Sequence, residues 1–282
     1  MKAWTWIKEH TVLFVGILAL VYMLLPIAVI AIFSFNDPSG RYNFEWVGFT
    51  TQYWQDPFGI SALTDALITS IQLAFLTSIG ATILGTLIAI ALVRYQFFGR
   101  RAANLLIVIP MATPEVVIGA SLLSMFLLYG AKLGFGTLLI AHIMFSISFV
   151  VIVVRSRLIG FDRRLEEAAA DLGASAFTTF RKVTLPLIAP GVGSAALLSF
   201  ALSIDDFVIS NFNSGSTVTF PLYIFGANQR GIPVQVNVIA TMLFVVTILA
   251  MLAVIIQQRR AEKMSAMRPE EIANKPAVSI PI

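Results

Sequence analysis

The sequence predicts an all-α, polytopic membrane protein with six transmembrane helices, and three observations support that fold class. Hydrophobic residues make up 58% of the chain and charged residues only 12%, against about 25% charged in an average soluble domain. Six stretches reach or approach the roughly 20 consecutive apolar residues that cross a bilayer. Lysine and arginine gather in alternate connections between these stretches, as they do on the cytoplasmic side of membrane proteins.

The six predicted spans follow one another through short connections, so we expect a single transmembrane domain at 12–258, between an N-terminus at 1–11 and a flexible tail at 259–282. The spans are about Val12–Phe35, Ala66–Val93, Ala103–Leu128, Phe135–Val154, Leu187–Ser203 with a continuation to Phe212, and Val236–Ile256. The first stretch is too long for the apolar region of a secretion signal and no small-residue cleavage site follows it, which predicts an uncleaved span.

Orientation follows from the basic residues. Sixteen lysines and arginines fall on the side that holds both termini and three on the other. The three are Arg41, Lys132 and Arg230. This asymmetry predicts that both termini are cytoplasmic. The net charge of +4 therefore reflects membrane topology and contact with lipid, and gives no reason to expect a nucleic-acid partner.

Three segments are expected on the outer side. Asn36–Asp65 carries aromatic residues that suit the membrane–water boundary. Gly130–Gly136 reads as a tight turn. Asn213–Gln235 is too polar to span, and its glycines and prolines predict a re-entrant or surface hairpin.

The longest predicted water-facing segment on the cytoplasmic side is Asp162–Pro186, which we call the elbow. Apolar residues recur there at the three- and four-residue steps of one helix face. Asp162 is a plausible N-cap, Gly173 breaks the pattern, and Ser175 can cap a second short helix. Pro186 then suits the first turn of the next span. The physical pattern alone leaves two alternatives open: a handle for another protein, or an interfacial helix that only anchors the loop.

The elbow resembles the EAA loop of ABC importer permeases. That family's pattern is EAA, three residues, glycine, nine residues, an aliphatic residue, one residue, then Leu-Pro. Every position matches here, with Val183 as the aliphatic residue. The matching residues are Glu167, Ala168, Ala169, Gly173, Leu185 and Pro186, and the acid Glu166 precedes them. The resemblance implies a type I (MetI-like) permease fold in the inner membrane of a bacterium, with the elbow seated in a cleft of an ATPase subunit.

ATP chemistry is expected elsewhere. The sequence contains no G-x-x-x-x-G-K-[ST] phosphate loop, so the chain itself is predicted to bind no cofactor. No catalytic set and no metal site is predicted. The resemblance implies that ATP and Mg²⁺ bind to a partner ATPase, and that a second permease subunit completes the pathway.

Three acids fall within the predicted spans, where ionisable groups are costly and by default mark a pathway. They are Glu115, Asp205 and Asp206. Glu115 lies roughly 20 Å into its span at 1.5 Å per residue, and the aspartates climb to a comparable depth in theirs. The aromatic residues Phe207, Phe212 and Tyr223 lie nearby in sequence and could face a cation. An acidic cavity with aromatic walls suits a cationic substrate.

Structural roles for these acids stay open. Glu115 follows Pro110 and Pro114 and could satisfy backbone groups freed at a helix break. Asp205 and Asp206 are adjacent and cannot share one helix face, so one is expected to cap a helix end or to bond to a neighbour. His142 is expected to be a hydrogen-bonded histidine of the bundle and not a ligand.

The stretch Leu202–Ser210, with its Ser-Ile-Asp-Asp core, is similar to the spermidine/putrescine permeases of the PotC type within that family. The resemblance implies a polyamine importer with a PotB-like second permease, a PotA-like ATPase and a PotD-like extracytoplasmic binding protein. Related permeases for ferric iron or thiosulfate share the elbow and remain the alternative. An ion-coupled secondary transporter would need no such elbow. A membrane-embedded enzyme finds little support in two histidines and no cysteine.

Overall fold

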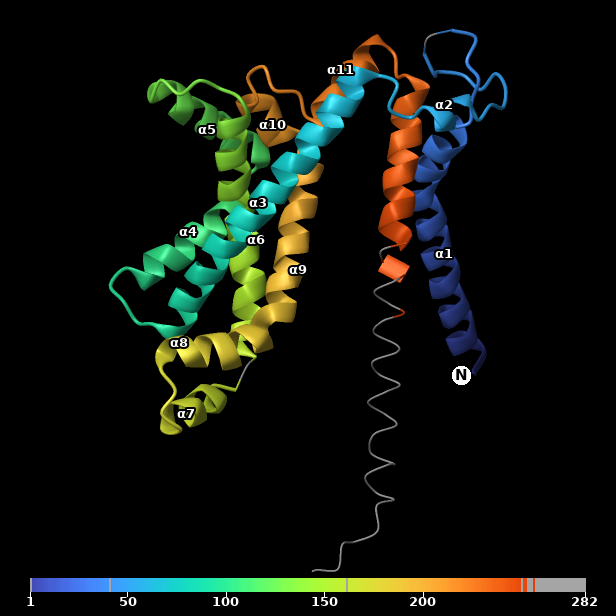
Figure 1. The fold of residues 1–282 in the computed structure, drawn as a ribbon. Helices are drawn as coiled ribbons and strands as arrows, with labels where there is room; N and C mark the ends of the chain where they lie inside the picture. Colours follow the sequence, from blue (N-terminus) through green and yellow to red (C-terminus); the bar gives the residue numbers. More distant parts are fainter. Residues whose placement is uncertain (1, 41, 161, 250, 253–255, 257–282) are drawn as a thin grey trace, which may run out of the picture. The chain divides into compact units, whose positions relative to one another are not determined.

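The computed structural model describes residues 2–40, 42–160, 162–249, 251–252 and 256, and these form helices joined by turns, with a single isolated bridge between Asn36 and Phe49 (Figure 1). The predicted all-α class is therefore confirmed over the described residues. The chain divides into two compact units, residues 60–230 and residues 1–59 with 231–282. The predicted tail at 259–282 lies outside the described residues.

Residues 60–230 contain three long helices that pack against one another, together with shorter helical pieces. The elements are α3 (Ser61–Arg94), α4 (Arg100–Ala112), α5 (Glu115–Leu128), α6 (Phe135–Ile159), α7 (Arg164–Asp171), α8 (Ala176–Thr179), a π-helical turn (Phe180–Thr184), α9 (Leu185–Ile204), α10 (Val208–Asn213) and α11 (Phe220–Arg230). Within this unit, α7 and α8 lie at one end of the long helices, and α5 and α10 lie at the other (Figure 1).

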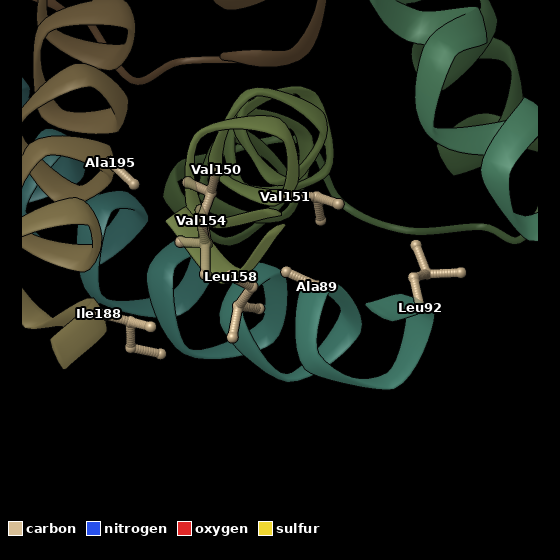
Figure 2. Close-up of a cluster of buried hydrophobic side chains, with 9 residues drawn as sticks. Ala89, Leu92, Val150, Val151, Val154, Leu158, Ile188 and Ala195 are labelled. Carbon is tan, nitrogen blue, oxygen red and sulfur yellow. The ribbon is translucent and has the colours of Figure 1, made fainter. Parts of the chain in front are cut away.

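The core of this unit lies where α3, α6 and α9 meet. Figure 2 shows Ala89 and Leu92 from α3, four aliphatic residues from α6, and Ile188 and Ala195 from α9 gathered in one cluster. Small residues let the helix backbones approach closely, as is usual in membrane bundles. At Gly85 of α3 an added Cβ would lie 2.6 Å from Val150 Cγ1 of α6, so only glycine fits there without a shift.

Four of the predicted spans appear in the described residues as helices long and apolar enough to cross a membrane, at His10–Phe33, Ser61–Arg94, Phe135–Ile159 and Ala176–Ile204. The predicted third span is different, because α4 and α5 meet at a bend of 113°. Pro114 disfavours helical geometry at the residue before it, and Thr113 is accordingly extended, with φ −87° and ψ 134°.

Two other predicted boundaries also differ from the structure. The helix of the fifth span is continuous with the second half of the elbow, through a π-helical turn in which Leu185 N–H bonds to Phe180 O, five residues back. Such a turn accommodates the backbone bond that Pro186 cannot make. The predicted hairpin at Asn213–Gln235 contains the helix α11, whose first turn holds Pro221, a position at which proline favours helix formation.

The second unit contains α1 (Lys2–Phe33), the short α2 (Gln52–Gln55) and an apolar helix at Val234–Leu249, which covers most of the described part of the predicted sixth span. Between α1 and α2 the chain folds around the side chain of Asn36. Its Nδ2 donates to Asn43 Oδ1 and to Glu45 O, both at 2.6 Å, and its Oδ1 accepts from Val47 N at 2.8 Å. The predicted outer segment thus contains a loop that folds around the buried amide of Asn36, followed by α2 and the first residues of α3.

Candidate functional site

The elbow turns at Gly173, where φ is +80°, a left-handed conformation that costs a residue with a Cβ about 1–2 kcal/mol. The turn is a Schellman motif at the end of α7. Ala174 N–H bonds to Ala169 O at 3.0 Å, and Gly173 N–H bonds to Ala170 O at 2.9 Å. Among the described residues, no atom of another segment lies within 4 Å of the place that a Cβ would take. The glycine is therefore required by backbone geometry and not by crowding.

Both predicted caps of the elbow make hydrogen bonds. Asp162 lies two residues before α7, so the N-cap position is Arg163 and not the predicted Asp162, but Asp162 Oδ1 still accepts from Arg164 N at 3.0 Å. Ser175 Oγ accepts from Thr178 N at 3.3 Å and caps α8. These bonds satisfy N–H groups at the helix starts that have no partner within the helix. The helix–turn–helix shape predicted from the sequence is present, but the second helix is not short, because it continues through the π-helical turn into α9.

The adjacent acids of the elbow have separate environments. Glu166 Oε1 accepts from Arg94 Nη2 at 3.0 Å and from Thr184 Oγ1 at 2.7 Å, which ties α7 to the end of α3 and to the π-helical turn. Glu167 is exposed, and its Oε1 lies 3.7 Å from Nε of Arg163, the residue just before α7. Glu166 thus holds the elbow against the bundle, and Glu167 is left on its outer surface.

Some large apolar side chains on the elbow are left exposed by the described residues. No residue of α7 or α8 is buried. Leu172 is 89% exposed and Phe177 is 71% exposed, and they flank the turn at Gly173. Clustered apolar groups on a water-facing segment indicate a contact surface.

Asp206 is a buried cap. Its carboxylate accepts from Ile209 N at 3.2 Å and from Ser210 N at 2.9 Å, which opens α10 and ends α9. His142 of α6 lies beside it, with Nε2 3.4 Å from Asp206 Oδ2. The imidazole is also bonded to Ser203 Oγ at 2.8 Å and to Ser210 Oγ at 3.0 Å. His142 is thus the hydrogen-bonded bundle histidine that the sequence predicted.

The other two acids are exposed on this chain. Asp205 follows the last residue of α9. Glu115 is the first residue of α5, and at this helix N-terminus the helix dipole favours a negative charge. The fold brings Glu115 near Asp205 and Asp206, because α5 is joined to α10 by the bond from Asn213 Nδ2 to Gly119 O at 3.3 Å. Residues 102–131 and 183–229 contain no lysine or arginine. Two helix breaks therefore gather three carboxylates in segments without basic residues.

The predicted aromatic residues take different places. Phe207 lies against Phe225 of α11, with ring centroids 4.7 Å apart. Phe212 packs on Gly119 of α5, where an added Cβ would lie 2.7 Å from the ring. Tyr223 is half-buried in α11. Of the three, Phe207 is the nearest in the chain to the exposed Asp205, two residues after it.

Sequence reasoning missed three residues of these sites: Arg94, Thr184 and Phe225. Arg94 is one of the sixteen basic residues on the predicted cytoplasmic side, and it ends an apolar helix of 34 residues, a position from which it can pair with an elbow acid. Thr184 lies between Val183 and Leu185 of the motif. Nothing local identifies Phe225 as the partner of Phe207, because they meet only through the packing of α11.

Comparison with known proteins places these features in a family. Residues 81–263 match the model of the "binding-protein-dependent transport system inner membrane component". The chain is 42% identical over 228 residues to the spermidine/putrescine transport system permease protein PotC of Haemophilus influenzae, covering 80% of this chain and 88% of that protein. It is 34% identical over 235 residues to the putrescine transport system permease protein PotI of Escherichia coli K12, covering 80% and 83%.

Solved structures share the fold at low sequence identity. A bacterial ABC transporter that imports the acidic polysaccharide alginate matches with a TM-score of 0.64 at 17% identity, over 89% of this chain and 95% of that one. The MetNI methionine ABC transporter matches with a TM-score of 0.56 at 16% identity, over 73% and 98%. The chain therefore belongs to the inner-membrane components of binding-protein-dependent transport systems, the permease subunits of ABC importers.

Proposed function

We propose that this chain forms half of the translocation pathway of an ATP-driven importer for polyamines, spermidine or putrescine. The observation that supports a polyamine substrate is the group of Glu115, Asp205 and Asp206 at two helix breaks, in segments without lysine or arginine. Carboxylates facing lipid would be costly, so their exposed side belongs to a wet pathway or to the second permease subunit. The relatives named as spermidine/putrescine and putrescine permeases agree with a cationic cargo.

Within this proposal the exposed acids contact the substrate. Asp205 and Glu115 offer charge to a passing ammonium group, and Phe207 offers an aromatic face beside them. Asp206 is occupied by the start of α10 and by His142, so it positions Asp205 at the break. Tyr223 remains a predicted pathway residue on α11. Exposed carboxylates compensate the positive charge of the substrate only weakly, so the substrate can leave again.

The elbow is the contact with the ATPase. Glu167, Ala168 and the apolar tip around Gly173 are exposed and fit, together with the partly buried Ala169, a cleft of a PotA-like subunit, which binds ATP and Mg²⁺. Glu166, Leu185 and Pro186 join this surface to α3 and α9. Closure of the ATPase pair then moves the elbow and opens the pathway to the outside, which is alternating access.

The full importer adds a PotB-like second permease and a PotD-like binding protein, which docks on the outer surface. Both termini lie in the cytoplasm, since the basic residues predict that side. This arrangement leaves ATP hydrolysis to the partner and assigns none to this chain.

Uptake by vesicles that hold the whole complex tests the proposal. Labelled spermidine or putrescine should accumulate only with ATP, the ATPase and the binding protein, and ferric iron or thiosulfate should neither accumulate nor compete. Accumulation of iron or thiosulfate instead would reject the polyamine cargo. Uptake that persists without the ATPase and follows an ion gradient would reject the importer mechanism in favour of a secondary transporter.

A further inference from the structure

The turn between α3 and α4 contains a pocket of about 500 Å³ that the transport mechanism does not use. Its lining residues are Gln96, Phe97, Gly99, Arg100, Arg101 and Asn104. We propose that this pocket binds the phosphate headgroup of an anionic phospholipid. The inference needs only the membrane setting of the family and does not depend on the cargo.

The pocket is positively charged and its charge is not compensated locally. Neither Arg100 nor Arg101 forms an ion pair with a carboxylate of the described residues. Residues 66–114 contain no aspartate or glutamate. The N-terminus of α4 lies at the same place and adds its partial positive charge. An anion is therefore the ligand that these groups favour.

A third guanidinium stiffens the pocket wall. Arg155 Nη1 of α6 donates to Asn104 Oδ1 at 2.8 Å, and Asn104 Nδ2 donates to Arg100 O at 2.9 Å. Asn104 therefore fixes the backbone that carries Arg100 and brings the charge of Arg155 near the pocket. The hydrogen bonds of Asn104 thus fix the start of α4, from which Arg100 and Arg101 extend.

The surface next to the pocket is apolar, and this feature selects a lipid. Ala103 and Ile107 of α4 pack against the core. Leu105, Leu106, Val108 and Ile109 point away from it and are exposed. They follow Arg101 by four to eight residues, or about 6–12 Å along the helix. Acyl chains can cover this face while the phosphate remains at the arginines, an arrangement typical of basic headgroup sites.

The aromatic residues of the turn support the same interpretation. Phe98 is fully exposed and Phe97 is partly exposed, at the end of a long apolar helix. Exposed aromatic residues beside basic ones are typical of the headgroup level of a membrane. A free phosphate ion would use the arginines but would leave the apolar face and these rings without a role.

The test counts phospholipids retained by the purified importer complex. The complex is placed in phosphatidylcholine nanodiscs with increasing phosphatidylglycerol, released, and weighed by native mass spectrometry. The variant Arg100→Gln/Arg101→Gln should bind phosphatidylglycerol about 10- to 30-fold more weakly than wild type, from about 1 kcal/mol for each basic residue. Arg101→Gln alone, at an exposed position, should lower binding about 5-fold and decides the matter if the double variant does not assemble.

A charge-matched control separates the pocket from net charge. Lys132→Gln/Arg230→Gln removes two exposed cations elsewhere and should retain phosphatidylglycerol as wild type does. Equal retention by pocket and control variants, or an equal loss in both, overturns the proposal. If wild type binds inorganic phosphate while phosphatidylglycerol retention ignores the pocket variants, the site takes a free anion and the lipid proposal fails. It also fails if those variants keep the lipid but lose the ATPase subunit.

Discussion

At the residue scale, adjacent acids in this chain have different roles because their side chains point in different directions. Asp206 is buried and accepts two backbone N–H groups, whereas Asp205 is exposed at the end of α9. The sequence predicted that one aspartate would act as a cap but left open which of them. The choice depends on the path of the chain after Ile204, which the contacts of α10 with α5 and α6 determine.

Substitution of the two aspartates should therefore have separable effects. Asp205→Asn should lower the initial rate of polyamine uptake at least about 5-fold, because one charge contact in wet surroundings is worth about 1 kcal/mol. Its thermal unfolding should stay at the wild-type temperature. Asp206→Ala removes a helix cap and should destabilise the subunit by about 0.5–2 kcal/mol, whereas Asp206→Asn keeps a capping oxygen. Uptake and thermal unfolding of the complex measure both; identical profiles for Asp205→Asn and Asp206→Ala would contradict the assignment.

Gly173 provides a second test at this scale. Gly173→Ala should cost about 1–2 kcal/mol at the elbow, since an L-residue is strained in the left-handed region. The strain should change the angle between α7 and α8, so that ATPase activity continues while uptake falls. Measurement of both rates in the reconstituted complex gives the coupling ratio.

The matched control for Gly173 is Gly193→Ala. Gly193 lies within α9, its φ is not positive, and nothing lies within 4 Å of an added Cβ. This change should leave the coupling ratio unaltered. A loss of coupling in both variants would mean that added methyl groups, and not the left-handed turn, are responsible.

At the element scale, the elbow is fastened to the bundle through one carboxylate. Glu166 receives hydrogen bonds from the end of α3 and from the π-helical turn that leads into α9. The same element presents Glu167 and the exposed Leu172 on its outer surface. Movement of α7 is therefore transmitted to α3 and α9 through the hydrogen bonds of Glu166.

Substitutions of the two elbow acids, Glu166 and Glu167, should have different effects. Glu166→Ala loses two hydrogen bonds to a charged group, about 1–3 kcal/mol, so α7 should exchange its amide hydrogens faster and uptake should fall. Glu167→Ala loses only an exposed pair, worth about 0–1 kcal/mol, so exchange in α7 should stay unchanged. Its uptake should fall through weaker contact with the ATPase. Equal exchange rates in the two variants would disprove the fastening role of Glu166.

The sequence predicted a helix correctly where an apolar run or a local capping or turn residue determines it. The apolar runs predicted α3 and α6, and Gly173 and Ser175 predicted the elbow turn. Pro114 indicated a break, but nothing local gives a bend of 113°, since the packing of α5 on α10 sets its direction. Likewise, the sequence predicted that one of the two aspartates binds backbone N–H groups. That this aspartate is Asp206 follows only from the fold, which places its carboxylate beside His142 and the N–H group of Ser210.

At the scale of the whole molecule, the sequence predicted the class and the sidedness, and resemblance supplied the assembly. The exposed apolar residues that cover α1 and much of α3 are expected for lipid contact and carry no information on cargo. The exposed acids and the elbow tip are unlike this surface. Their surroundings are completed by other subunits, so a single chain can indicate them but cannot predict their final contacts.

Topology is the prediction that tests the whole arrangement, and the absence of cysteine from the sequence makes it direct. Single cysteines at exposed positions can be labelled in intact cells with a maleimide that does not cross membranes. Lys132→Cys and Arg230→Cys should react from outside, because both residues belong to the outer set. Arg101→Cys and Arg163→Cys should react only after the membrane is opened, since these positions belong to the start of α4 and to the elbow, on the predicted cytoplasmic side. Labelling of Arg163→Cys in intact cells would place the elbow outside, where no ATPase could reach it, and would overturn the proposed coupling.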